Sequence, residues 1–387
     1  MPIKTLAGLI QSYLPEMIAF RHEMHQNPEL SGQESKTSDK VADLLEHYGY
    51  SVTRHIGGNG IVASLTNGDG QKSIGIRADM DALPIKEETN LAYASTNEGV
   101  MHGCGHDGHT TILLAAARAL AMTKKFNGTV HLIFQPAEEI GAGAKAMIAD
   151  GLFERFPCDA VYGLHNWPGL EQGKIQFTQK AMMASVDAVK IVIYGKGGHG
   201  AKPEAAIDPI VVASSTILAM QTIVSRNVGP LDSAIISTGS IHGGEAFNII
   251  PDSVTISMTV RTFSSDVQNL IEKRIKKIVG NQAESFGARA FVQYDRLVPA
   301  LVNHPQCTKF ALDVGKKLLG SDKIVEDETP TTVSEDFAFM LKACPGAFFF
   351  LGNGESASLH SPHYNFDDRN IVSGAVFWCG LVESVLQ

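Results

Sequence analysis

The stretch TTILLAAARALAMTKKFNGTVHLIFQ, residues 110–135, decides the fold class. Its first half, 110–122, is apolar almost throughout and long enough to form a buried helix. After a short, mostly polar break, residues 128–135, which begin with a glycine, form a short apolar run of the kind found in buried strands. A buried helix followed by a buried strand is typical of an α/β protein, in which helices cover a mostly parallel sheet.

The same alternation continues on both sides of this stretch. Helices are expected over 34–48, 304–319, 334–343 and 369–386, and strands over 61–65, 73–81, 160–165 and 346–352. The sequence therefore predicts an α/β domain with a mostly parallel sheet that is built from both ends of the chain.

The pattern changes near Ser185, where strands with alternating polarity begin. The expected elements are a strand at 186–195, a helix at 208–227, strands at 233–241 and 252–263, a helix at 264–287 and a strand at 288–297. This β-α-β-β-α-β order is the ferredoxin-like motif. We therefore expect three segments: a catalytic domain in two parts, 1–184 and 299–387, with a ferredoxin-like domain inserted at 185–298.

The composition is that of an ordinary soluble protein. The chain has 387 residues, 44% of them hydrophobic and 19% charged, with a net charge of −9. The negative charge argues against nucleic acid as a partner. The N-terminus predicts one amphipathic helix and neither a signal peptide nor a membrane anchor. Five scattered cysteines do not form a disulfide framework, so we expect a reducing cytoplasm.

Residues of the types that bind metal ions follow several of the expected strands. In an open α/β sheet, ligands bind beyond the carboxyl ends of the strands, so these residues should meet at one edge. They are Asp79 and Asp81, Glu138 and Glu139, His165, and His360 and His363, together with Cys104 and His106 in the stretch MHGCGHDGH, 101–109, which is expected to be a loop before a helix.

Each of these residues also has a purely structural interpretation. Cys104 alone is a small buried hydrophobe, and Asp107 is a possible helix cap. Backbone groups could satisfy His102 or His109, and a glutamate doublet is usually a solvated face. Together, however, thiolate, imidazole and carboxylate are the ligand types of a transition-metal site.

The glutamate doublet favours a catalytic site over a structural one. A structural zinc site is closed and is made mostly of Cys and His. Here one glutamate can bind metal while its neighbour takes a proton from water that the metal activates, which suits hydrolysis. A zinc deaminase also pairs a metal with glutamate, but its H-x-E and P-C-x-x-C signatures do not occur in this chain.

Eight motifs, in order along nearly the whole chain, resemble the M20 metallopeptidases. They are RADMDALPI, MHGCGHDGHT, FQPAEE, GLHNWP, GKGGHGAKP, FNIIPD, SEDF and LHSPHYNF. The nearest branch contains hippurate hydrolases, N-acyl-amino-acid deacylases and auxin-conjugate hydrolases. The resemblance implies an α/β catalytic domain with an inserted ferredoxin-like lid that commonly forms homodimers, or a dimer of dimers.

The resemblance also implies a pair of divalent metal ions, for which manganese, zinc, nickel and cobalt are all credible. The residues that match the ligands are Cys104, His106, Glu139, His165 and His360. Glu138 matches the general base, and Asp81 matches an aspartate that supports a ligand. Other branches place an aspartate between the two metals, where this chain has His106. His363 is treated as a non-ligand.

Three residues of the inserted domain are matched in the same way. His199 resembles a histidine that stabilises the tetrahedral intermediate, although it could be an ordinary turn histidine. Asn248 and Arg261 resemble residues that hold polar groups of the substrate. Arg261 could instead be a surface charge at the end of a strand.

The expected function is metal-dependent hydrolysis of the amide bond of N-acyl amino acids, with hippurate (N-benzoylglycine) as the first substrate to test. The nearest alternative is a dipeptidase, or a deacetylase of N-acetyl amino acids or of a diaminopimelate precursor, with the same fold. A catalytically silent metal-binding or ligand-binding protein is a different class, and the intact Glu138 argues against it.

Overall fold

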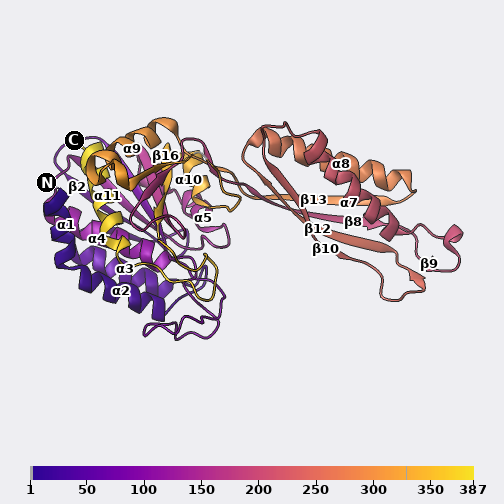
Figure 1. Cartoon of the computed structure of the whole chain (residues 1–387), viewed down its shortest axis with the longest axis horizontal. Coiled ribbons are helices and arrows are strands. Elements are labelled where there is room, and N and C mark those ends of the chain that lie inside the picture. The colour runs from indigo at the N-terminus through magenta and orange to yellow at the C-terminus, as the bar shows by residue number, and fades with distance from the viewer. Residues whose placement is uncertain (1–2, 328) are drawn as a thin grey trace. The chain divides into compact units, whose positions relative to one another are not determined.

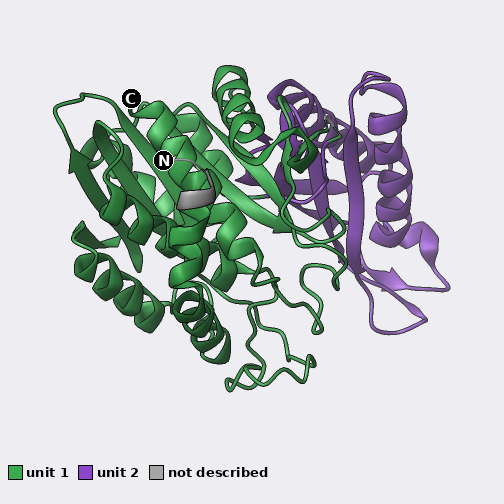
Figure 2. Cartoon of the chain, turned by 60° about the vertical axis from the view of Figure 1, so that its left-hand side comes forward, with its two compact units in different colours: residues 1–180, 302–329, 335–387 green, residues 181–301, 330–334 purple. Residues whose placement is uncertain are grey.

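The computed structural model describes residues 3–327 and 329–387. The chain divides into two compact units, which Figure 2 shows in two colours. Unit 1 comprises residues 1–180, 302–329 and 335–387, and unit 2 comprises residues 181–301 and 330–334. The predicted domain boundaries at 184/185 and 298/299 stay a prediction.

Unit 1 is an α/β unit around one eight-stranded sheet of order β1-β2-β4-β3-β5-β16-β6-β15 (Figure 1). The strands are β1 (Ser51–Ile56), β2 (Gly60–Asn67), β3 (Ser73–Asp79), β4 (Gly128–Gln135), β5 (Ala160–Trp167), β6 (Ile175–Phe177), β15 (Ile324–Glu326) and β16 (Gly346–Gly352). The four central strands β4, β3, β5 and β16 are mutually parallel. The predicted mostly parallel α/β sheet is confirmed, and antiparallel pairs join β1 to β2, β2 to β4 and β16 to β6.

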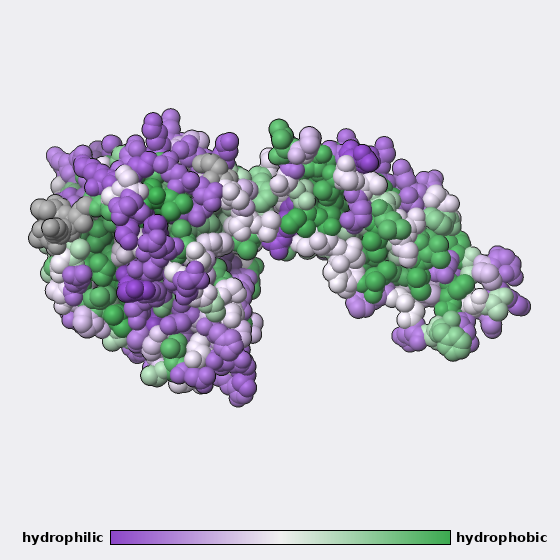
Figure 3. Space-filling model, viewed as in Figure 1, coloured by the Kyte–Doolittle hydropathy of each residue, from purple (hydrophilic) through white to green (hydrophobic). Residues whose placement is uncertain are grey.

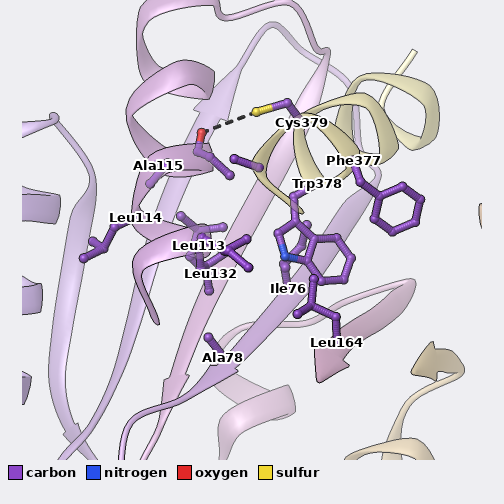
Figure 4. Packing of buried hydrophobic residues seen from close by; sticks show 14 of the residues in the cluster. Ile76, Ala78, Leu113, Leu114, Ala115, Leu132, Leu164, Phe377, Trp378 and Cys379 are labelled. Atoms are coloured by element: carbon purple, nitrogen blue, oxygen red, sulfur yellow. Dashed lines mark hydrogen bonds between the residues drawn. The ribbon is translucent and has the colours of Figure 1, made fainter. Parts of the chain in front are cut away.

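Helices pack around this sheet because their apolar faces need cover. They are α1 (Ile3–Ser12), α2 (Leu14–Gln26), α3 (Ser35–His47), α4 (His106–Thr123), α5 (Gly143–Ala149), α6 (Leu152–Arg155), α9 (Pro305–Leu319), α10 (Phe337–Ala343) and α11 (Asn370–Val385). Figure 4 shows Leu113 of α4 and Trp378 of α11 packed above the strand residues Ile76, Leu132 and Leu164. Burial of such side chains stabilises the fold by about 1.5–3 kcal/mol each.

The N-terminal region differs from the prediction of a single amphipathic helix. Two helices form, and the break falls at Tyr13 because Pro15 occupies the first turn of α2. Arg21 of α2 is fully buried.

Unit 2 has the β-α-β-β-α-β order that the sequence predicts. Its main elements are β8 (Val186–Tyr194), α7 (Pro209–Arg226), β10 (Ala234–His242), β12 (Ser253–Thr262), α8 (Ser265–Ser285) and β13 (Arg289–Val298). The strand order is β10-β12-β8-β13, and all three pairings are antiparallel. The two-stranded pairs β7 (Ala181–Met183) with β14 (Leu301–Val302) and β9 (Gly198–His199) with β11 (Ile249–Ile250) complete the strands.

The helices of unit 2 pack on its sheet. Side chains of β8 alternate between buried and more exposed positions, and the buried set joins α7 and α8 in one apolar cluster. By length and composition alone α7 could cross a membrane, and 33% of it is buried. Core helices of soluble proteins meet the same test, so this helix is weak evidence for a membrane.

Candidate metal centre and catalytic base

The motif at 101–109 is divided between a loop and the first turn of α4. The helix begins at His106, not at residue 110 as predicted, and Gly105 precedes it in the left-handed conformation, with φ 88°. A Cβ atom at Gly105 would lie 2.3 Å from Nδ2 of Asn166, so only glycine fits there. The expected helix start was wrong because residues 106–109 are polar or glycine, a composition that favours a loop. Their hydrogen-bond partners come from distant parts of the chain and are not visible in the local sequence.

Cys104 lies between two histidines from distant parts of unit 1. Its Sγ is 3.3 Å from Nε2 of His165, on β5, and 3.4 Å from Nε2 of His360, in the loop after β16. The His360 side chain is 55% exposed, so this side of the cluster is open to solvent. Because β5 and β16 are parallel neighbours, their carboxyl ends deliver both histidines to one edge of the sheet.

Glu139 connects this group with His106. Its Oε2 is 3.4 Å from Nε2 of His360, and its Oε1 is 3.8 Å from Nε2 of His106. The potential ligand atoms form overlapping groups: Cys104, His106 and His165; Cys104, Glu139 and His360; and His106, Glu138 and Glu139. The structure thus brings together all five residues that the sequence matched to ligands.

Neighbouring oxygens orient the imidazoles. Nδ1 of His106 lies 2.9 Å from the carbonyl oxygen of Asp81 and 3.2 Å from its Oδ1. Nδ1 of His165 lies 2.7 Å from the carbonyl oxygen of Asn166. With Nδ1 donating to these oxygens, Nε2 of each ring is left as the free acceptor toward the cluster, as a metal ligand requires. Asp81 thus contacts His106, and its role in supporting a ligand stays a prediction.

The donor set fits divalent metal ions. Nε2 of His106 and Oε1 of Glu139 are buried without a hydrogen-bond partner, and these two atoms face each other. Burial raises the pKa of Glu139 to about 7. Burial lowers the pKa of His106, but Asp79, Asp81 and Glu139 outweigh it and raise the value to about 10. Such crowding of carboxylates favours cations, and the mixed sulfur, nitrogen and oxygen donors suit transition metals.

Glu138 lies beside the ligand cluster. Its Oε1 accepts the backbone N–H of Asp336 at 3.3 Å. Burial, followed by the charges of Glu335, Glu139 and Asp336, holds the pKa of Glu138 well above its usual range. A carboxylate with raised proton affinity at the edge of a metal cluster has the properties of a general base.

Further buried residues support the cluster, and the sequence analysis assigned most of them no role. His109 uses both ring nitrogens: Nδ1 lies 2.6 Å from Oδ1 of Asp79, and Nε2 accepts the backbone N–H of Asn166 at 2.9 Å. Arg77 donates to Asp79 at 2.7 Å and to Glu335 at 2.9 Å. The period-two spacing of Asp79 and Asp81 was the available signal, since both carboxylates lie against His106.

Three other residues that the sequence analysis considered have different environments. Asp107 accepts hydrogen bonds from Arg21 and His25 inside the protein. His102 is buried, and neither of its ring nitrogens has a hydrogen-bond partner among the described residues, so no described backbone group satisfies it. His363 is 60% exposed, and its Nδ1 lies 3.1 Å from the carbonyl oxygen of Glu88.

The remaining predicted site residues lie in unit 2. His199 is exposed on β9, where it pairs with Ile249 of β11, and Asn248 is exposed just before β11. The backbone N–H of Gly200 donates to the carbonyl oxygen of Asn248 at 2.8 Å, which keeps these two segments together. Arg261 is half-buried on β12.

A mostly parallel α/β sheet that ends in a Cys, His and Glu cluster beside a second glutamate is typical of a metal-dependent hydrolase. Residues 75–384 match peptidase family M20/M25/M40, and the chain belongs to this family. The family that the sequence motifs predicted is thus confirmed.

Similar proteins agree with this assignment. The chain is 44% identical to the hippurate hydrolase of Campylobacter jejuni over 372 residues, which cover 96% of this chain and 97% of that one. It is 40% identical to the N-acetyl-L-cysteine deacetylase of Bacillus subtilis, with 94% and 86% covered. Among solved structures, the YXEP protein of Bacillus subtilis, a dinuclear metal-binding peptidase of the M20 family, has a TM-score of 0.87, 31% identity and coverage of 97% and 99%.

Proposed function

We propose that this protein hydrolyses the amide bond of N-acyl amino acids to a carboxylic acid and a free amino acid. The observation that carries the proposal is the glutamate doublet, in which Glu139 lies within 3.4 Å of His360 and 3.8 Å of His106, while Glu138 accepts the backbone N–H of Asp336. Bound divalent ions would supply a Lewis acid that acidifies water and polarises the scissile carbonyl group.

The residues of the chain account for the proton transfers. Glu138 takes a proton from the attacking water as the new C–O bond forms, and it then donates that proton to the amine nitrogen as the C–N bond breaks. The N–H of Asp336 holds the Glu138 carboxylate in place for both steps. Cys104, His106, Glu139, His165 and His360 are the proposed metal ligands, and Asp81 orients His106.

Arg261 suits the free carboxylate of such a substrate. Among the residues that the structure describes, its side chain forms neither a hydrogen bond nor an ion pair, and burial lowers its pKa. An unpaired, half-buried guanidinium is a strong site for a carboxylate, which it can bind through two hydrogen bonds. We assign it, with Asn248, to substrate binding.

Hydrolysis of hippurate tests the proposed substrate class, and the Arg261→Lys variant tests how the substrate carboxylate is recognised. We expect the manganese-loaded protein to release benzoate and glycine from hippurate, as measured by chromatography. Arg261→Lys should raise KM for hippurate because lysine lacks the planar two-pronged donor, and it should leave KM for N-benzoylglycinamide nearly unchanged.

Other outcomes separate the alternatives. Equal changes of KM for the acid and the amide would show that Arg261 is structural. Faster cleavage of N-acetylcysteine or of a dipeptide than of hippurate would replace the proposed substrate by the alternative one. Complete inactivity on a panel of N-acyl amino acids would favour the silent binding protein.

Unit 2 offers a surface for a homodimer. Large apolar side chains are exposed on α7 and on the edge strand β10, among them Val211, Leu218, Ile235 and Ile241. Figure 3 shows hydrophobic residues on the visible face of this unit. An edge strand with exposed apolar neighbours is a ready partner for a second copy. We propose that unit 2, the predicted lid, forms a homodimer or a dimer of dimers. We also propose that the protein resides in the cytoplasm.

His199 is proposed to stabilise the tetrahedral intermediate in the active site of the partner subunit. His199→Ala and Glu138→Gln should each be nearly inactive alone. After the two variants are mixed and their subunits re-equilibrated, a heterodimer would contain one site with both residues intact, so part of the activity should return. Heterodimers verified by tag pull-down that show no recovery would exclude a role for His199 across subunits.

A further inference from the structure

The turn that carries the base and a proposed ligand has an unusual backbone. Ala137, between Pro136 and Glu138, has φ 52°, in the left-handed region that residues with a side chain rarely adopt. This residue sets the direction in which Glu138 and Glu139 leave the end of β4. Something must therefore hold the turn in this conformation.

Two carboxylates hold the backbone on either side of Glu138. The N–H of Ala137 donates to Oε1 of Glu34 at 2.9 Å, and the N–H of Glu139 donates to Oδ2 of Asp81 at 3.0 Å. Glu138 thus lies between two backbone groups that are each fixed by a buried acceptor.

The Glu34 carboxylate joins its own loop to the turn at Ala137. It is fully buried, and although it is the N-cap residue of α3, its side chain does not cap that helix. Its Oε1 also accepts the N–H of Gly32 at 2.7 Å, and its Oε2 accepts Nδ2 of Asn59 at 3.1 Å. In the part of the chain that the structure describes, no cation pairs with it, so a carboxylate is kept at considerable desolvation cost.

The same short loop also supports the second carboxylate. Oγ of Ser31 donates to Oδ2 of Asp81 at 2.6 Å, the oxygen that holds the N–H of Glu139. Residues 31–34 therefore reach both ends of the turn, directly through Glu34 and indirectly through Ser31 and Asp81. Two independent contacts from one loop to one strained turn indicate a dedicated support.

We propose that Glu34 is a positioning residue, which fixes the left-handed turn at Ala137 and thereby aims Glu138 at the reacting water and Glu139 at the metal. This inference rests on the proposed function of Glu138 and Glu139. The conformation of the turn, and not the charge of Glu34 itself, is what matters.

Removing the acceptor should impair catalysis more than substrate binding. We expect Glu34→Ala to lower kcat about 10- to 100-fold with little change in KM, because misplacement of a catalytic group costs such factors. Calorimetric titration should show Mn²⁺ binding weakened by roughly tenfold, the usual effect of lost ligand support. Glu34→Gln keeps Oε1 as acceptor for both N–H groups and should stay close to wild type. If Glu34→Ala does not fold, Glu34→Asp is the second variant to test. Its shorter side chain keeps the charge but does not reach the N–H of Ala137, so the same losses are expected.

A double variant separates positioning from general destabilisation. At saturating Mn²⁺, where weakened metal binding no longer matters, Glu34→Ala combined with Glu138→Gln should be no slower than Glu138→Gln alone if Glu34 acts on kcat through Glu138. A multiplied loss in kcat would overturn the proposal, as would a Glu34→Gln variant as defective as Glu34→Ala.

Glu29 provides the matched control. Its carboxylate accepts the backbone N–H groups of Lys36 and Thr37 at the start of α3 and does not contact the turn. Glu29→Ala should lower Tm without changing kcat or Mn²⁺ affinity, and kcat losses equal to those of Glu34→Ala would contradict the proposal.

A Glu138→Gln variant with full turnover would refute the proposed base, whereas unweakened Mn²⁺ binding in Glu34→Ala would refute the present inference.

Discussion

Glu138→Gln is expected to lower kcat by at least ~10²-fold, the contribution of a general base. Glutamine has nearly the same shape, and its side-chain oxygen can still accept the N–H of Asp336, so the fold and the ligand cluster should persist. What the amide lacks is the ability to take up a proton. Steady-state kinetics on hippurate, with metal content measured on the same sample, checks this expectation.

Glu139→Gln is the informative comparison, because it changes the neighbouring carboxylate. It should weaken metal binding, since Glu139 is the residue that joins the two parts of the ligand cluster. Near wild-type turnover of Glu138→Gln would remove Glu138 from the mechanism. Loss of metal from Glu138→Gln would instead make it a ligand.

Cys104→Ser and His165→Ala are each expected to lose bound metal and, with it, nearly all activity. Cys104 is the residue within 3.4 Å of both His165 and His360, so either change removes a donor from the centre of the cluster. Elemental analysis after dialysis measures the bound metal, and removal of divalent ions from the wild-type protein by a chelator should abolish activity as well.

His363→Ala serves as the control for these two variants. His363 follows His360 by three residues, but its side chain is largely exposed and its ring nitrogens lie near the carbonyl oxygen and the carboxylate of Glu88. Its replacement should leave metal content and kcat unchanged. Unchanged metal occupancy in both Cys104→Ser and His165→Ala would refute the ligand assignment.

The sequence could predict the ligand cluster because its members follow regular elements. Asp81, Glu138 and His165 come at or just after the ends of parallel strands, and parallel strands bring their ends to one edge. The order of these elements is visible in apolar runs, and the α/β class follows from the same runs. The motifs of the M20 family added the identity of the base.

Apart from Asp81, the supporting residues could not be predicted, because their partners are distant along the chain. Glu34 contacts Ala137, and Asp336 contacts Glu138, with no local pattern that relates either pair. The SEDF motif is visible in the sequence, but only the fold shows that the backbone N–H of its Asp336 donates to Glu138, the proposed base. The short strands β6 and β15 were missed because three residues carry too little pattern.

The place of β16 in the sheet determines when a growing chain can acquire activity. This strand, residues 346–352, pairs with both β5 and β6, although it is synthesised about 170 residues after them. On the ribosome, β5 would therefore wait with an unpaired edge while all of unit 2 emerges and folds, and His360 emerges later still. A chain cut short before residue 360 would possess most of the hydrophobic core but an incomplete ligand cluster, so partly made copies would be inert rather than unregulated hydrolases.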